Sequence, residues 1–228
     1  MATCCLCNKS GWFMKTSADG LCEVCEATLE MDIEQHGRII TESVKLINTS
    51  ANLSTRLSRI GVAINSCQAL RRYELHGLKT IQTPPSDAIS ELYQAREAMI
   101  IEAINNELIK AKTKSENAAT PAGKVSPYSR VIDKIASLYQ ELDDVTCLEQ
   151  LEVETRAEMD KARLKAELEK AEKAEFRGQK KRALTAYLDA LFCLTKDTID
   201  DKLQKRERAL IESKIKELGG EIPNLDAP

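Results

Sequence analysis

The stretch Cys-Cys-Leu-Cys-Asn-Lys-Ser-Gly-Trp-Phe-Met-Lys-Thr-Ser-Ala-Asp-Gly-Leu-Cys-Glu-Val-Cys, residues 4–25, decides the fold of the N-terminus. Its cysteines form two Cys-x2-Cys pairs, Cys4 with Cys7 and Cys22 with Cys25, and 14 residues separate the pairs. A tight turn can present both thiolates of one pair to a metal ion, and two pairs complete the tetrahedral shell that zinc takes in structural sites. We therefore predict one structural Zn2+ bound by these four cysteines.

A fifth thiol, Cys5, lies inside the first pair. The x2 spacing favours Cys4 as the ligand, but the sequence leaves open whether Cys5 binds in its place. A redox role is disfavoured because no βαβ pattern surrounds either pair. An iron centre and chance clustering of cysteines stay open beside zinc. Residues 1–35 are too few to bury a sufficient apolar core, so we expect the metal to make this fold.

The segments between and after the cysteine pairs indicate a small finger. Trp12-Phe13-Met14 is a candidate strand, residues 17–20 are a turn signal, and a helical pattern follows Cys25. This order resembles a treble-clef finger or a zinc ribbon. The resemblance implies a short hairpin, a helix and zinc, but no particular task. We expect Trp12 and Phe13 to lie in the finger core rather than to stack on nucleic-acid bases.

Charge argues against nucleic acid as a ligand. The formal net charge of the chain is −3, and residues 1–36 carry two lysines against six carboxylates. Proteins that hold phosphate backbones need clustered positive charge on the binding face. An acidic finger therefore favours a protein partner.

Residues 36–114 are predicted to be helical and similar to a coiled coil. Apolar residues make up 43% of the chain but aromatic residues only 4%, so aliphatic side chains must fill the core. A narrow apolar seam recurs at steps of 4, 3, 4 and 3 and consists of Leu53, Leu57, Ile60, Ile64 and Cys67. Such a seam suits packing on another helix. It could close within one chain or between two, which leaves a homo-oligomer open.

A segment rich in Pro, Gly, Ser and Ala, residues 115–127, is predicted to be a linker. It would separate the coiled-coil-like region from a helical domain over residues 128–228. Within that domain, residues 147–177 carry a thin apolar stripe among many charges, which favours a solvated helix supported by ion pairs over a partner-binding helix. The predicted fold is mainly α, with the zinc finger followed by an elongated helical bundle.

Residues 165–218 resemble the helical hairpin of a tetratricopeptide repeat followed by a third helix. Small or shape-defining residues occupy the positions where two helices approach and turn: Ala171, Ala174, Gly178, Ala183, Tyr187 and Ala190. The spacing is also similar to that of a microtubule-interacting-and-trafficking bundle. The third helix is expected over Ile199–Leu218, ending at Gly219-Gly220.

This resemblance implies protein or peptide binding, and it has clear departures. Lys180 replaces the usual turn aromatic, no proline closes the second helix, and no second copy occurs in the chain. Two antiparallel helices without any relation to these families explain the pattern as well. The basic run Lys180-Lys181-Arg182 is interpreted as a solvated loop, with contact to an acidic partner as the alternative.

These features together favour a zinc-binding adaptor or scaffold whose helical body binds proteins, and not an enzyme. His36 and His76 are the two histidines, and the sequence lacks a phosphate-binding glycine motif and a nucleophile elbow. The alternative is a regulator associated with nucleic acid or the transcription machinery. The N-terminus lacks the regions of a secretory signal, and no apolar run approaches the about 20 residues of a membrane span, so we expect a cytoplasmic protein without a membrane partner.

Overall fold

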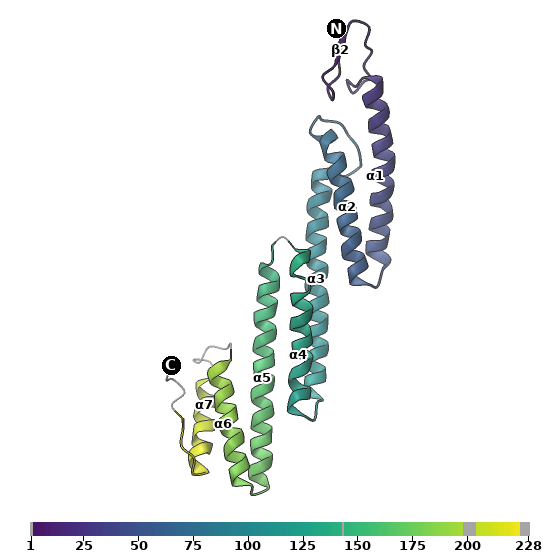
Figure 1. Ribbon diagram of the computed structural model, residues 1–228. Coiled ribbons are helices and arrows are strands. Elements are labelled where there is room, and N and C mark those ends of the chain that lie inside the picture. The colour runs from purple at the N-terminus through teal and green to yellow at the C-terminus, as the bar shows by residue number, and fades with distance from the viewer. Residues whose placement is uncertain (1, 143, 198–203, 224–228) are drawn as a thin grey trace. The chain divides into compact units, whose positions relative to one another are not determined.

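The computed structural model describes residues 2–142, 144–197 and 204–223 and is 75% helical (Figure 1). Over these residues the elements are β1 (Ala2–Thr3), β2 (Ser10–Gly11), α1 (Glu23–Thr49), α2 (Leu53–Glu74), α3 (Pro85–Glu116), α4 (Pro121–Ala136), a short 3-10 helix η1 (Tyr139–Glu141), α5 (Thr146–Phe176), α6 (Lys180–Lys196) and α7 (Lys205–Glu217). The prediction of a mainly α chain with an N-terminal cysteine cluster and a helical body is confirmed.

The chain divides into two compact units, Met1–Ile100 and Ile101–Pro228, and the division falls within α3. The domain boundaries predicted from the sequence are not tested by this division and stay predictions.

In the first unit, α1 and α2 form an antiparallel hairpin (Figure 1). Asn52, in the turn between the two helices, is the N-cap residue of α2. Its side chain accepts hydrogen bonds from the backbone N–H groups of Ser54 and Thr55, at 2.9 and 3.4 Å. Asparagine is among the best residues at this position because its oxygen satisfies N–H groups that lack a helical partner.

Four of the five residues of the predicted apolar seam of α2 are buried within the chain, and Leu53 at its start is partly exposed. Leu57, Ile60, Ile64 and Cys67 are all buried. Ile60 and Ile64 form a core cluster with Ile47 of α1, and the side chains of α3 that pack on this cluster are Ile89, Leu92 and Met99. A second chain is therefore not needed to cover these two isoleucines.

The predicted linker over residues 115–127 is a short turn between two helices. Helix α3 continues to Glu116, and α4 already begins at Pro121. The Thr120 hydroxyl accepts from the backbone N–H of Gly123 at 3.1 Å, and the proline follows at the first helical position. Thr-Pro is a signal for a helix start, so the composition of this segment marks a helix cap rather than a flexible linker.

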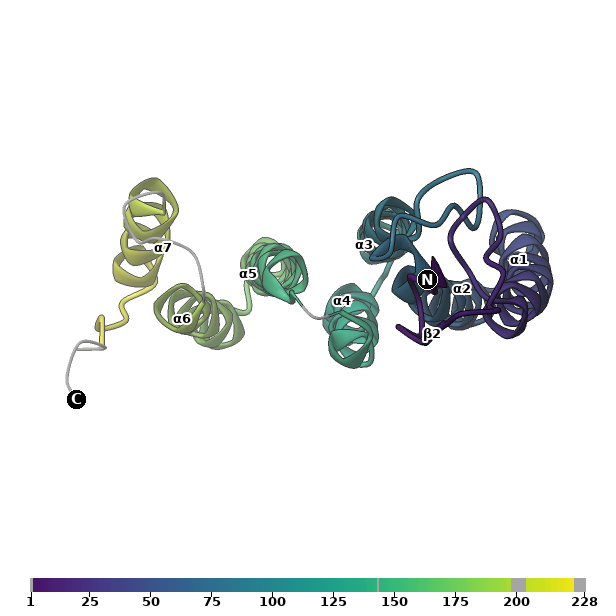
Figure 2. The ribbon, with the colours of Figure 1, turned by 90° about the horizontal axis from the view of Figure 1, so that it is seen from above.

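The interpretation of residues 147–177 as a solvated helix is wrong, because α5 packs against α4 and against α6 (Figure 2). Leu148, Leu151 and Thr155 are buried, and so are Ala171 and Ala174 further along the helix. Alanine lets a neighbouring helix approach closely while contributing little hydropathy. The second buried face of α5 therefore does not stand out as an apolar stripe in the sequence.

The hairpin predicted near the C-terminus is present as α5 and α6. At the turn Gly178 has φ +69°, and the backbone N–H of Gln179 donates to the carbonyl of Ala174 at 2.9 Å. Glycine is the residue that adopts this left-handed conformation without strain. The core between the helices contains the predicted small positions together with residues of α7: Ala171, Ala174, Ala183, Ala186, Tyr187, Ala190, Leu191, Leu194, Ile211 and Ile215. The relation to either repeat family stays a prediction.

The third helix is shorter than predicted over the part of the chain that the structure describes. Helix α7 covers Lys205–Glu217, and residues 199–203 of the predicted Ile199–Leu218 helix lie outside the described residues. The expected end at Gly219-Gly220 is confirmed. Gly219 has φ +80°, and the N–H of Gly220 donates to the carbonyl of Ile215 at 2.9 Å.

Candidate metal centre

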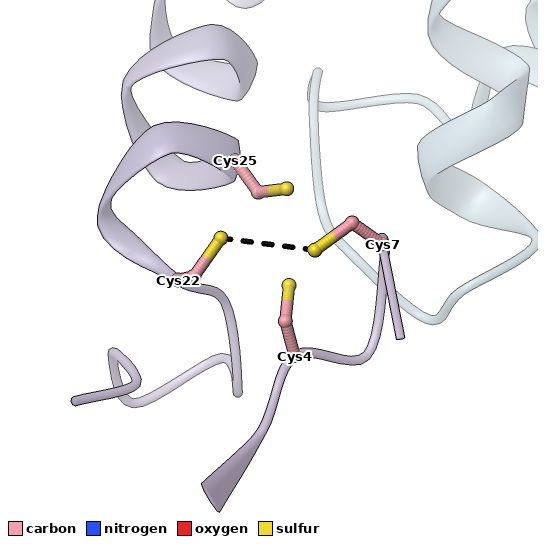
Figure 3. A group of neighbouring side chains, drawn as sticks. All are labelled: Cys4, Cys7, Cys22 and Cys25. Carbon is pink, nitrogen blue, oxygen red and sulfur yellow. Dashed lines mark hydrogen bonds between the residues drawn. The ribbon is translucent and has the colours of Figure 1, made fainter. Parts of the chain in front are cut away.

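Four cysteine sulfurs converge at the N-terminal end of the first unit (Figure 3). The Sγ atoms of Cys4, Cys7, Cys22 and Cys25 all lie within 4.8 Å of one another. Within the described residues this is the one group of three or more His, Cys, Asp or Glu side chains close enough to share a metal ion. The structure thus brings together the four residues that the sequence predicted as ligands.

The first cysteine pair sits in a tight turn that is fixed by backbone hydrogen bonds. The N–H of Cys4 donates to the carbonyl of Lys9, and the N–H of Asn8 donates back to the carbonyl of Cys4, both at 2.9 Å. Asn8 has φ +58°, a left-handed conformation that asparagine tolerates better than most residues. The turn is closed by β1 and β2, which pair antiparallel with Thr3 opposite Ser10.

The second pair sits where the chain enters α1. Cys22 is the N-cap residue of the helix, and Cys25 lies in the first turn. The N–H of Ser17 donates to the carbonyl of Leu21 at 2.8 Å, which closes the turn before the helix. Because helix N-termini present free N–H groups and positive partial charge, this end of α1 suits thiolates.

The finger core differs from the prediction. The short strand lies at Ser10–Gly11 and not at Trp12-Phe13-Met14. The side chains of Trp12 and Phe13 are 81% and 95% exposed, so the expectation that they fill the finger core is wrong. Cys4 and Leu21 are buried in their place. With four sulfurs at its centre, a fold this small has room for few further core side chains.

Sulfur spacing fits a tetrahedral zinc site. With zinc–sulfur bonds of about 2.3 Å, the edge of a regular tetrahedron is about 3.8 Å. The Sγ atoms of Cys7 and Cys22 are 3.8 Å apart (dashed line in Figure 3). All four cysteines are free, and this separation is far from the about 2.05 Å of a disulfide. The donor set and its spacing therefore suit a metal ion that prefers thiolate ligands.

The pKa values of the thiols indicate that a cation is needed before all four sulfurs can ionise. Hydrogen bonds from the backbone N–H groups of Cys7 and Cys22 lower the pKa of the Cys4 thiol to about 6. Burial and the three neighbouring thiols raise the pKa of Cys25 to about 12. The peptide groups stabilise one negative charge, while a further charge in the same small space is disfavoured. A bound cation would remove that penalty and allow all four sulfurs to ionise.

The other cysteines lie outside this cluster. Cys5 is exposed and its thiol donates to the carbonyl of Asp19 at 3.3 Å. Cys67 is buried in α2, and Cys147 and Cys193 are partly buried in α5 and α6. The geometry thus favours Cys4 over Cys5 as the fourth sulfur of the group.

The finger packs directly on the helical hairpin of the same unit. Cys4, Leu21 and Leu29 share a buried cluster with Leu70 and Tyr73 of α2. At its edge the Asp32 carboxylate of α1 accepts hydrogen bonds from the Tyr73 hydroxyl and the Arg72 guanidinium. Sequence reasoning missed this network, because 40 residues separate the partners and no local pattern joins them. It ties the two helices together next to the sulfur cluster.

The Asp32 network predicts a pH-dependent contribution to stability. The hydrogen bond from Tyr73, with Arg72 beside it, lowers the pKa of Asp32 below its ordinary 3.8. A carboxylate with a lowered folded pKa stabilises the fold above its unfolded pKa, and this contribution is lost as pH falls through the folded value. We expect Asp32→Asn to cost about 1 kcal/mol at pH 7, the typical net value of such hydrogen bonds.

Urea unfolding of the wild-type chain and the variant, compared over a pH series, tests this prediction. The gap between the two should be constant near neutral pH, should begin to close below pH 3.8, and should vanish below the lowered pKa of folded Asp32, where its carboxyl is protonated. A gap that persists unchanged into stronger acid would show that the charge on Asp32 is not what stabilises the contact.

The comparisons with known proteins give no further lead. A scan against protein-family models, a search of curated proteins and a search of solved structures each returned no match to this chain.

Among the described residues, no helix combines the length and the hydropathy that crossing a bilayer requires. His36 lies on α1 and His76 in the turn after α2, and neither belongs to the sulfur cluster.

Proposed function

We propose that this chain is an adaptor protein in which a structural zinc ion, held by Cys4, Cys7, Cys22 and Cys25, orders the N-terminal finger and the helices bind partner proteins. The observation that carries the proposal is the convergence of four sulfurs within 4.8 Å of one another, with Cys7 and Cys22 at the tetrahedral spacing of 3.8 Å. Four thiolates fill the shell of zinc and leave no open position for a substrate or an activated water. Zinc in such a site supports a fold and its surfaces rather than a reaction.

The exposed apolar side chains of the finger support a role in protein binding. Trp12 and Phe13 project from the finger, and Val24 in the first turn of α1 is 75% exposed. Phe13 and Val24 line one hollow beside the cluster, together with Met14. Exposed aromatic side chains are enriched at protein interfaces. Since the metal orders the turns that carry these residues, zinc and partner binding would be coupled.

The alternative proposal, a regulator associated with nucleic acid or the transcription machinery, is weakened by the charges around these residues. Six carboxylates outnumber Lys9 and Lys15 within residues 1–36, and two of them, Glu23 and Glu26, occupy the first turn of α1. Such a finger would bind a polymerase or another protein more readily than a phosphate backbone.

Chemical crosslinking of the tagged full chain in its source cells, followed by affinity purification and mass spectrometry, tests the proposal. We expect to capture a protein that remains bound after nuclease treatment. Once purified, that protein should also bind the zinc-loaded chain on a size-exclusion column. The double variant Trp12→Ala/Phe13→Ala, which removes only exposed side chains, is expected to bind it at least tenfold more weakly if the finger contributes. Capture that disappears with nuclease would favour the nucleic-acid alternative.

A further inference from the structure

A basic groove lies in the second unit, where the turn before α4 and the turn between α5 and α6 are at the same end (Figure 1). The groove encloses about 750 Å³, a typical size for a binding pocket. One carboxylate, Glu169, lines it together with six cationic residues, Lys124, Lys170, Lys173, Arg177, Lys181 and Arg182. In a chain whose net charge is −3, this is a marked local excess of positive charge.

Internal ion pairs satisfy the cations at one side of the basic groove. Lys124 is nearly buried and donates to Glu169 at 2.6 Å. Lys170 pairs with Glu167 at 2.8 Å and lies 3.5 Å from Asp189. These lysines hold the helices together and have little charge left for a ligand.

Cations at the other side have no such partners. Among the residues that the structure describes, Arg177, Lys181 and Arg182 form no ion pair with a carboxylate, and Arg182 donates only to the neutral side chain of Gln179, at 3.2 Å. All three are exposed, Arg177 in the turn that joins α5 to α6 and Lys181 and Arg182 in the first turn of α6. Like charges held close together repel one another, so an anion bound between them would be stabilised.

Two further features suit a peptide. Small or apolar residues also line the groove: Ala166 and Ala174, which are buried, and Ala119 and Pro121, which are exposed. These four residues are called its apolar floor below. The side chain of Gln179, the N-cap residue of α6, accepts no hydrogen bond from the backbone N–H groups of the helix, so N–H groups at this positive helix end can donate to an acidic group. The twelve residues from Ala166 on α5 to Arg177 at its C-cap span about 16 Å, the length of three helical turns.

We propose that the basic groove binds an acidic, amphipathic segment of a partner protein, with apolar side chains on the apolar floor and carboxylates at Arg177, Lys181 and Arg182. The proposal rests on the proposed function as a protein-binding adaptor and names the chemistry of the partner. The short apolar floor suits a peptide and offers nothing to a nucleic-acid chain.

A fluorescein-labelled synthetic peptide of about 12 residues, long enough for three helical turns, is the probe. It carries Leu at helical i, i+3 and i+4 spacing and Glu elsewhere, and fluorescence anisotropy measures its binding to the zinc-loaded full chain. We expect saturable binding that weakens with salt, and at least a tenfold loss in the variant Arg177→Glu/Lys181→Glu/Arg182→Glu. Two of these changes place Glu in the first turn of α6, where negative charge is favourable, so the fold should persist.

The matched control is Lys205→Glu/Arg206→Glu/Lys216→Glu, which changes the net charge equally on exposed positions of α7 outside the groove. It should keep most of the affinity. Equal loss in both triple variants, unchanged binding of a peptide with Gln in place of Glu, tighter binding of a single-stranded oligonucleotide, or no binding up to about 1 mM would each overturn the proposal.

The partner identified by crosslinking separates this proposal from the adaptor function. Loss of that partner in the groove variant supports both. Binding that is unaffected by the groove variant would overturn the acidic-segment proposal and leave the adaptor function standing, whereas a chain that binds the probe but no protein would contradict the adaptor function.

Discussion

Replacing Cys22 with serine is expected to release the metal and unfold the finger. Elemental analysis should find about one zinc per wild-type chain and almost none in the variant, because a hydroxyl is a poor replacement for one of four thiolates. Structural zinc contributes on the order of 10–16 kcal/mol in isolated finger peptides, far more than so small a core can supply. Amide hydrogen exchange should show loss of protection over the turns around Cys4 and Cys22.

The disturbance should extend beyond the finger to its contacts with α2. Cys4 and Leu21 share a buried cluster with Leu70 and Tyr73, so an unfolded finger exposes these side chains to water. Protection at the finger-facing ends of α1 and α2 is therefore expected to fall, while the second unit stays unchanged. A chelator strong enough to remove zinc should reproduce this pattern in the wild-type chain.

Cys5→Ser is the matched control, since it makes the same chemical change one residue from a predicted ligand. Cys5 is exposed and its sulfur lies outside the cluster, so zinc content and protection should be retained. Stoichiometric zinc in Cys22→Ser would contradict the ligand set. Loss of zinc in Cys5→Ser would mean that Cys5 and not Cys4 completes the shell.

The parts of the fold that follow from local patterns were predictable from the sequence. The two cysteine pairs are each confined to four residues, so a turn and a helix start are enough to aim their sulfurs at one point. The seam of α2 and the glycine end of α7 likewise depend on residues within a few turns of one another. Such features need no knowledge of which segments meet in space.

The remaining features depend on contacts between distant segments. Trp12 looked like a core residue because of its hydropathy, yet the sulfurs and Leu21 already occupy the centre of the finger. The salt-bridged Lys124 and Glu169 come from different helices, and 45 residues separate them. The spacing of Lys170, Lys173 and Arg177 at i, i+3 and i+7 was a visible sign of a basic face on α5, but their neighbours across the groove were not.

The second large effect is expected for Leu191→Ala in α6. Leu191 is fully buried in the cluster shared by α5, α6 and α7, and five of the ten buried residues there are alanines: Ala171, Ala174, Ala183, Ala186 and Ala190. Alanines already bring the helix backbones close together, so they cannot move inward to fill a new cavity. A Leu→Ala change in a core costs about 2–5 kcal/mol, most where the surroundings cannot collapse, and we expect the upper part of that range.

Leu210→Ala in α7 is the control, since the same atoms are removed from a side chain that is 61% exposed. Surface substitutions of this kind usually change stability by less than about 0.5 kcal/mol. Urea unfolding followed by circular dichroism should therefore move strongly to lower denaturant for Leu191→Ala and hardly at all for Leu210→Ala. Because both variants gain the same small helix propensity of alanine, the difference between them measures packing alone. Equal shifts would mean that the α5–α6 interface is loose enough to collapse around the missing side chain, and it would then be a poor scaffold for the basic groove at its end.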